Sequence, residues 1–182
     1  MTTALLLFFA VFGTLFVLKM TYAVSVAVSI PVTQGALYVS TSGYRLKAFF
    51  DEISMTPDQV FIDIGCGDGR ALRLASTRYG IKGVGYEVNP LAFLKATLLS
   101  LGHPKVRIRY SNFFNQDLSQ ADVVLCYLYP DVMKKVADKF RSELTTGTIV
   151  GSFNFELPGF VPQAILTPGN SLHNSPIYIY RI

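Results

Sequence analysis

The chain has 182 residues, enough for one domain and an appendage, and it carries a formal net charge of +4. Charged residues make up 15% of the chain and hydrophobic residues 51%, whereas about 25% of the residues in a typical soluble domain are charged. The small positive charge excludes the strongly basic composition typical of nucleic-acid-binding domains, and we expect no nucleic-acid partner.

The apolar excess lies at the N-terminus, where residues 4–18 are almost wholly apolar and a second apolar run follows Lys19. A helix rises about 1.5 Å per residue and a bilayer core is roughly 30 Å thick, so one membrane span fits within residues 3–30. Lys19 can extend toward the interface, and Tyr22 suits the head-group region. We therefore expect residues 1–30 to anchor the chain in a lipid bilayer.

Two other interpretations of this segment stay open. Small residues at 23–27 would suit the cleavage site of a signal peptide, although no Lys or Arg precedes the apolar run. A buried core helix would need a polar face, which residues 4–18 lack. The basic residues Lys19, Arg45 and Lys47 favour the cytoplasmic side, or the mitochondrial matrix side, for the rest of the chain.

Beyond the anchor, residues 31–43 read as a connector, and residues 44–182 alternate between helical and strand patterns. Asn89 and Pro90 mark one helix start, because Asn caps helices well and Pro fits the first turn. Apolar spacing predicts helices at 44–55, 70–79, 90–101 and 131–144, and strands at 60–64, 83–87, 106–110, 121–127 and 148–155, with short candidates at 163–166 and 176–181.

Strands that alternate with helices predict a Rossmann-like α/β domain with a doubly wound, mostly parallel sheet. The gap at 156–162 is too short for a helix with its loops, so we expect the sheet to finish with a C-terminal antiparallel hairpin. The whole prediction is one N-terminal transmembrane helix, a connector, and one α/β domain over residues 44–182.

A glycine-rich turn follows the first predicted strand. Gly65, Gly67 and Gly69 permit tight backbone angles and let a ligand lie against bare backbone, and the helix start after them offers free N–H groups. A dinucleotide fingerprint would need a glycine where Arg70 stands, and the Lys-Ser/Thr of a phosphate-binding loop is absent. The pattern instead favours another ligand at the carboxyl ends of the strands.

Glu87 ends the second predicted strand and gives the second signal. A carboxylate there can accept hydrogen bonds from both hydroxyls of a ribose and would repel a 2′-phosphate. Together, the turn and Glu87 predict a site for a compact ligand that contains an unphosphorylated ribose.

These motifs resemble a known class. The runs IDIGCGDGR and GYEVNP, and the LYP after the fourth strand, are similar to class I S-adenosylmethionine-dependent methyltransferases. More narrowly, the chain resembles the membrane-anchored protein lysine methyltransferases that act on adenine nucleotide translocase, and their archaeal relatives. This likeness covers nearly the whole chain, including the ALYVST connector and the FNFELPGF segment after strand five.

The resemblance implies S-adenosylmethionine as the cofactor, with Glu87 holding the ribose hydroxyls and Asp63 the methionine amino group. The family usually has Asp where this chain has Asn112, whose amide can also donate. The further contacts implied are backbone groups of Gly65, Cys66 and Gly67, closure over the methionine end by Tyr38 and Thr41, and cover of the adenine by Asn112 and Phe113.

The resemblance also implies a protein substrate that presents a lysine. Lysine must lose its proton before it attacks a methyl group, and an apolar aromatic channel favours the neutral amine. The aromatic residues at the carboxyl ends of strands four and five, with Glu156 to orient the amine, would form this channel: Tyr127, Tyr129, Phe153 and Phe155.

Two further functions remain alternatives: methylation of a small or lipid molecule, and a non-catalytic, membrane-tethered cofactor-binding module. The sequence does not reveal the oligomeric state. Cys66 and Cys126 lack metal-ligand spacing with either histidine, so we expect no metal site and two reduced thiols. Lys134, Lys135, Lys139 and Arg141 are expected on the solvated face of their helix.

Overall fold

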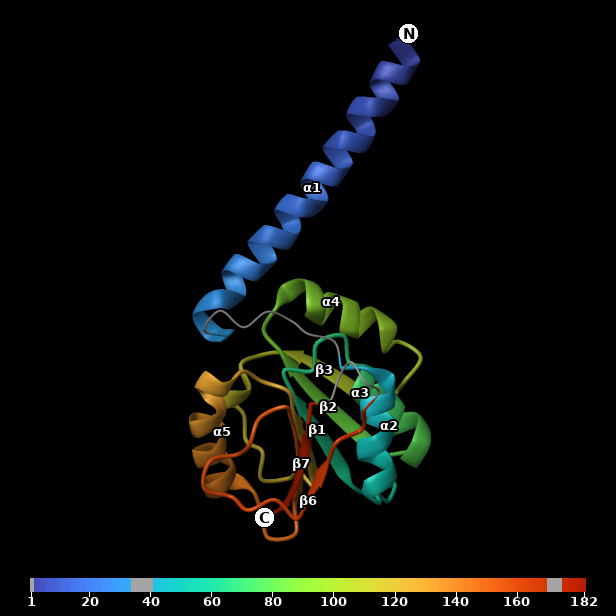
Figure 1. Ribbon diagram of the computed structural model, residues 1–182. Coiled ribbons are helices and arrows are strands. Elements are labelled where there is room, and N and C mark those ends of the chain that lie inside the picture. The colour runs from blue at the N-terminus through green and yellow to red at the C-terminus, as the bar shows by residue number, and fades with distance from the viewer. Residues whose placement is uncertain (1, 34–40, 170–174) are drawn as a thin grey trace.

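The computed structural model describes residues 2–33, 41–169 and 175–182, with side chains described up to residue 27 in the first range. Helix α1 (Thr2–Thr33) extends away from an α/β domain, as Figure 1 shows. Its segment Thr2–Ala27 has a mean hydropathy of 2.1, and none of its most apolar window is buried. Its length and composition are those of a helix that could cross a membrane.

The domain is built on one seven-stranded sheet in the order β3-β2-β1-β4-β5-β7-β6. Neighbouring strands from β3 to β5 are parallel, and β7 runs antiparallel to both β5 and β6. The Rossmann-like fold and the antiparallel C-terminal pair are therefore confirmed. The strands are β1 (Val60–Ile64), β2 (Lys82–Glu87), β3 (Val106–Tyr110), β4 (Val123–Cys126), β5 (Ile149–Phe153), β6 (Ala164–Leu166) and β7 (Ile177–Arg181).

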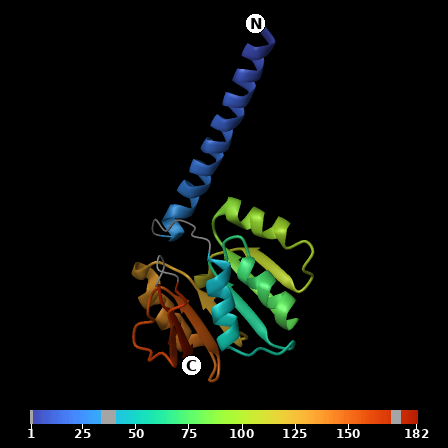
Figure 2. The ribbon, with the colours of Figure 1, turned by 45° about the vertical axis from the view of Figure 1, so that its right-hand side comes forward.

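Helices cover both faces of the sheet, which gives two apolar cores. Helices α2 and α3 pack on one face and α5 on the other (Figures 1 and 2). The strands between them are apolar on both sides because each side meets a helix. The helix bounds are α2 (Gly43–Glu52), α3 (Arg70–Tyr79), α4 (Pro90–Leu99) and α5 (Pro130–Glu143), with a short 3-10 turn η1 (Phe113–Asn115).

Local sequence signals explain the helix starts that position the site. The side chain of Asn89 accepts hydrogen bonds from the backbone N–H groups of Leu91 and Ala92, and Pro90 occupies the first turn of α4. Gly69 caps α3 in the left-handed conformation that glycine adopts without strain. Both helices therefore begin directly after the carboxyl ends of β1 and β2.

Candidate active site

The glycine turn between β1 and α3 is tight, and of its three glycines Gly65 is exposed whereas Gly67 and Gly69 are buried. Gly65, Gly67 and Gly69 have φ values of 77°, 55° and 73°, in the left-handed region where other residues are strained. The backbone N–H groups of Gly65 and Cys66 both donate to the carbonyl of Tyr86, at 2.9 and 3.0 Å. These bonds fasten the turn to β2 and use N–H groups that a ligand would otherwise bind.

Glu87 faces this turn. Its side chain is only 7% exposed, and its carboxylate accepts hydrogen bonds from the N–H groups of Gly67 at 2.8 Å, Val88 at 2.9 Å and Asn89 at 2.8 Å. A carboxylate offers about four lone-pair sites, so these bonds fix its orientation and leave one site. Glu87 lies where the sequence predicts, and its ribose contact stays a prediction.

Asp63 lies buried at the centre of a group of acids. Burial, with smaller contributions from the nearby carboxylates of Glu87 and Asp68, raises the pKa of Asp63 from 3.8 to about 8. Burial also raises the pKa of Glu87, partly offset by its backbone hydrogen bonds. The carboxylate of Asp68 pairs with Lys95 at 3.5 Å, and its backbone carbonyl accepts a hydrogen bond from the guanidinium of Arg73. Such a cluster favours a positively charged ligand, which would stabilise the ionised carboxylates.

Cys66 is buried beside the same turn. Burial and the charge of Asp63 raise the pKa of the Cys66 thiol well above its usual value, which keeps the thiol protonated. A side chain at Gly85 would place its Cβ 2.5 Å from Leu72 and 2.6 Å from the Cys66 sulfur. Cys66 therefore packs inward against β2, and both cysteines of the chain are free thiols.

The segment expected to cover the adenine follows β3. The carbonyl oxygen of Asn112 accepts a hydrogen bond from the N–H of Phe114 at 3.0 Å, which leaves the amide NH2 of Asn112 as the group that can face a ligand. Phe113 is 9% exposed and its ring centroid lies 4.2 Å from that of Phe114. The adenine contacts of Asn112 and Phe113 stay predictions.

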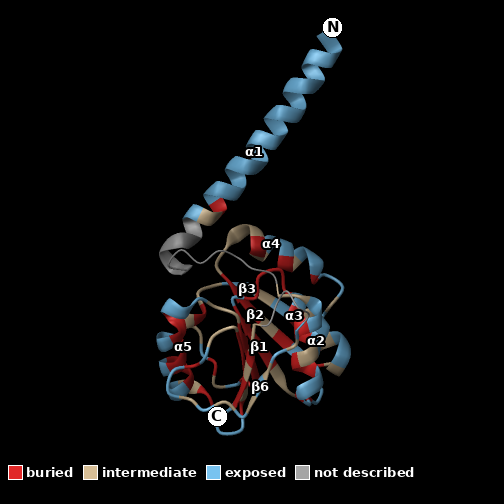
Figure 3. Cartoon of the chain, in the orientation of Figure 1, coloured by how far each residue is buried: buried red, intermediate tan, exposed pale blue. Residues whose placement is uncertain are grey.

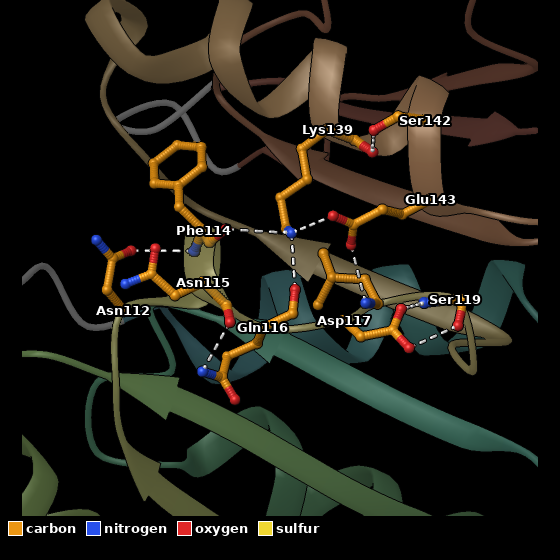
Figure 4. Close-up of polar contacts among 10 residues, drawn as sticks. Asn112, Phe114, Asn115, Gln116, Asp117, Ser119, Lys139, Ser142 and Glu143 are labelled. Carbon is orange, nitrogen blue, oxygen red and sulfur yellow. Dashed lines mark hydrogen bonds and ion pairs between the residues drawn. The ribbon is translucent and has the colours of Figure 1, made fainter.

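Lys139 holds this segment in place, as Figure 4 shows. Its ammonium donates to the carbonyls of Gln116 at 2.7 Å and Phe114 at 3.4 Å, and it pairs with Glu143. Glu143 in turn accepts a hydrogen bond from the N–H of Leu118 at 3.0 Å. The expectation that Lys139 lies on the solvated face of α5 is wrong, because the segment after η1 folds over that part of the helix.

The aromatic residues after β4 and β5 have different environments. The ring of Tyr127 is half-buried, whereas Phe153 is fully buried. The guanidinium of buried Arg45 lies 5.7 Å from the Tyr127 ring centroid and 5.0 Å from that of Phe153. The face of Phe153 is therefore occupied by a cation of the protein itself, and only Tyr127 of this pair has exposed surface.

Tyr129 and Glu156 lie nearer to solvent. Tyr129 precedes α5 and is 42% exposed. Glu156 is exposed and faces Tyr178, whose pKa is raised by burial and then by this carboxylate. Phe155 is half-buried against the core beside α5. Glu156 therefore lies beside Tyr178. The roles expected of Tyr129 and Glu156 in the lysine channel stay predictions.

Asn154, directly after β5, is a polar residue beside Tyr127 that was not predicted from the sequence. Its side-chain NH2 donates to the hydroxyl of Tyr127 at 3.0 Å. Its side-chain carbonyl oxygen is buried without a hydrogen-bond partner among the described residues. Its φ of 73° is the one left-handed value of a non-glycine residue in the part of the chain described. The sequence signal was an Asn directly after β5, since Asn tolerates this conformation.

Two expected contacts lie in or next to the connector. Tyr38 lies outside the described residues, and Thr41 is half-buried just before α2. Their closure over a cofactor stays a prediction. Within residues 2–33, 41–169 and 175–182, no group of three or more His, Cys, Asp or Glu side chains is arranged to hold a metal ion.

Comparison with known proteins finds one matching protein family and several similar enzymes. The model of the ANTKMT methyltransferase domain matches residues 63–164. A protein-lysine N-methyltransferase of Saccharolobus islandicus (strain REY15A) is 31% identical over 150 residues, which cover 80% of this chain and 92% of that enzyme. The adenine nucleotide translocase lysine N-methyltransferase of Mus musculus is 29% identical over 145 residues, which cover 77% of this chain and 62% of the mouse enzyme.

A solved structure is similar in fold and sequence. An RNA methyltransferase from Salinibacter ruber, crystallised with S-adenosyl-L-homocysteine, gives a TM-score of 0.73 at 27% identity. The match covers 79% of this chain and 94% of that protein. The likeness therefore extends over most of this chain and nearly all of a protein that was crystallised with the product of methyl transfer.

Proposed function

The chain belongs to the ANTKMT methyltransferase family, and on this basis we propose that it methylates a lysine side chain of a membrane-associated protein. Its cofactor is S-adenosylmethionine. The observation that carries the proposal is that three buried carboxylates, those of Asp63, Asp68 and Glu87, lie together at the glycine turn between β1 and α3.

The chemistry of this cluster fits the cofactor, which supplies an electrophilic methyl group on a cationic sulfur when it is bound. The N–H groups of Gly65, Cys66 and Gly67 are all used within the protein, and the Cys66 carbonyl accepts from the N–H of Gly69 at 2.8 Å, so the turn would offer a ligand the carbonyl oxygens of Gly65 and Gly67 rather than donors. Carbonyls and the Asp63 carboxylate suit the ammonium of a methionine group. The carboxylate of Glu87 already faces the glycine turn, and it would accept a hydrogen bond from a ribose hydroxyl at its remaining lone-pair position.

The edge formed by Tyr127 and Asn154 suits an amine. The side-chain carbonyl oxygen of Asn154, buried and without a hydrogen-bond partner among the described residues, and the Tyr127 hydroxyl are hydrogen-bonding groups at the ring of Tyr127. The guanidinium of Arg45 places a positive charge 5.7 Å from the centre of that ring, which disfavours a second cation and so favours a neutral lysine amine. Held in line with the methyl group, such an amine needs mainly alignment to react.

We further infer that α1 spans a membrane once and that the catalytic domain lies on the cytoplasmic, or mitochondrial matrix, side. The span is supported by the exposed, apolar residues 2–27. The side is supported by Lys19, Arg45 and Lys47, which follow the apolar run. Proteolysis of sealed vesicles from each side tests the orientation, because only an outward-facing domain is digested before the vesicles are opened.

The experiment for the function is a methylation assay on separated cell fractions. The full chain, in detergent or nanodiscs, is incubated with methyl-labelled S-adenosylmethionine and with membrane, soluble-protein, RNA or lipid fractions. The proposal predicts label on proteins of the membrane fraction, located on lysine by mass spectrometry. The Glu87→Ala variant serves as the control without cofactor binding.

Each other outcome points to another function. Label in the lipid extract would favour a small or lipid substrate, and label in RNA would favour the activity of the Salinibacter relative. Label confined to soluble proteins would retain lysine methylation and overturn the membrane-associated substrate. Cofactor binding without label in any fraction would favour a non-catalytic module.

A further inference from the structure

Helix α4 and the turn that follows it expose several leucines. Leu94 and Leu98 lie one helical turn apart on one side of α4 and are 52% and 57% exposed, and Leu101, 77% exposed, follows in the turn after the helix ends at Leu99. The opposite side of α4 is buried through Ala92 and Ala96. Soluble proteins rarely leave such an apolar face in water, and the described residues of the domain do not cover it, so we look for a partner outside them.

The same helix is attached to the base of the membrane helix. The hydroxyl of Ser25 in α1 donates to the Asn89 side chain at 2.8 Å and accepts from the N–H of Leu91 at 3.2 Å. Ser25 is 5% exposed, although most neighbouring residues of α1 are exposed, as Figure 3 shows. The first turn of α4 is therefore fastened to α1 at a defined depth along the span.

That depth coincides with the edge of a bilayer. The 26 residues of Thr2–Ala27 extend about 39 Å, and the bilayer core is roughly 30 Å thick. A span that fills the core from its N-terminal end reaches the head groups just before Ser25. Helix α4 lies at the end of the domain from which α1 projects; its first turn lies beside the lower part of α1, and the helix then runs away from α1 (Figures 1 and 2).

We propose that α4 is an interfacial helix that lies on the bilayer beside the span, with Leu94 and Leu98 of the helix, and Leu101 of the turn after it, inserted among the lipids. The occupant of the leucine face is the lipid surface, because the face continues from the point where α1 leaves the membrane. Amphipathic helices bind membranes in this way. This inference rests on the proposed membrane span, and it adds a second contact that fixes how the domain is oriented.

The contact would bring the active site close to the membrane. Asn89, which Ser25 binds, is two residues from Glu87 and also donates its backbone N–H to the Glu87 carboxylate. The carboxyl edge of the sheet would therefore face the bilayer surface at short range. A lysine near that surface would reach the site, and one far from it in solution would not.

The chain contains no tryptophan, which makes a fluorescence test direct. A single tryptophan is introduced by Leu98→Trp in the full chain, which is reconstituted into phosphatidylcholine vesicles with or without brominated acyl chains. The proposal predicts that the emission is blue-shifted and that brominated lipid quenches most of it. The Leu94→Trp variant repeats the measurement, so a folding defect in one variant does not decide the result.

Two controls separate the possible failures. Phe12→Trp, within α1, must be quenched if the span is in the bilayer, and Val161→Trp, 90% exposed before β6, must remain unquenched. Loss of quenching at Phe12→Trp would overturn the span itself. Quenching at Phe12→Trp without quenching at Leu94→Trp and Leu98→Trp would overturn the interfacial helix alone, and a blue shift under those conditions would show that protein, such as a second copy of the chain, covers these positions instead of lipid.

Discussion

The carboxylate of Glu87 accepts a hydrogen bond from the backbone N–H of Gly67 at 2.8 Å. This bond joins the end of β2 to the turn that follows β1, so the acid and the glycines are held in a fixed relationship before any ligand arrives. Preorganisation of this kind avoids the cost of ordering the groups on binding. The predictions below test the turn, its electrostatics and the segments around it.

Gly85 keeps the glycine turn close to β2, and an alanine there should displace it. The new Cβ would lie 2.5 Å from Leu72 and 2.6 Å from the Cys66 sulfur, an overpacking that costs about 1–3 kcal/mol. We expect Gly85→Ala to lower the melting temperature and weaken cofactor binding. Gly102→Ala is the matched control, because nothing lies within 4 Å of its Cβ; equal behaviour of the two variants would contradict the close packing.

Asp63 should make the stability of the free protein depend on pH. Because its pKa is raised from 3.8 to about 8, the folded state keeps a proton that the unfolded state has lost between these values. The free energy of unfolding should therefore fall as pH rises through this window, by up to about 1.4 kcal/mol per pH unit. Melting curves of the detergent-solubilised protein from pH 5 to 9 measure this fall.

The Asp63→Asn variant separates this effect from other titrations. It should melt higher than the wild type at pH 9, should differ less at pH 5, and should lose cofactor affinity. A wild type whose stability does not change between pH 5 and 8 relative to this variant would show that Asp63 is ionised throughout.

Lys139 should support cofactor binding from a distance, because it fastens the segment expected to cover the adenine. Lys139→Met removes bonds to two carbonyls and leaves Glu143 without its partner, at a cost of about 2–4 kcal/mol. We expect a lower melting temperature and a higher Kd for S-adenosylmethionine. Lys135→Met, on the exposed side of the same helix, should change neither; a harmless Lys139→Met would show that the network is dispensable.

Asn154 should matter for methyl transfer more than for cofactor binding. Asn154→Gly removes the contact with Tyr127 and relieves the left-handed backbone, so we expect a stable protein with kcat lower by about 10–100-fold and an unchanged Kd for the cofactor. Asn154→Ala should lose both activity and stability, because alanine is strained at this φ. Full activity of the glycine variant would remove Asn154 from the acceptor site.

The order of the elements was predictable because each carries a local signal. The cap formed by Asn89 and Pro90, the glycines at 65–69 and the short apolar strands depend on neighbouring residues in the chain. The predicted limits of α3 and β1 agree with the structure, and α4 ends two residues earlier than predicted. The place of β7 between β5 and β6 was not predictable, since strand order depends on pairing between distant segments.

The site shows the same division. The position of Glu87 follows from the end of a strand, but the contacts of Lys139 and Ser25 come from segments remote in sequence. Periodicity places Lys139 on the polar side of α5, and only the folded chain reveals that another segment covers it. The same holds for Phe153, whose ring was expected to face a substrate and instead faces Arg45.

Titration calorimetry of S-adenosylmethionine into the full chain tests the central claim most directly, by comparing the wild type with Glu87→Ala and with Glu52→Ala, an exposed acid of α2. Loss of the buried acid would remove the charged hydrogen bond proposed to the ribose and leaves the Gly67 N–H without its acceptor, so affinity should fall by about 100-fold or more. The Glu52→Ala variant should bind as the wild type does. A wild type that does not bind the cofactor, or a Glu87→Ala variant with unchanged affinity, would contradict the account.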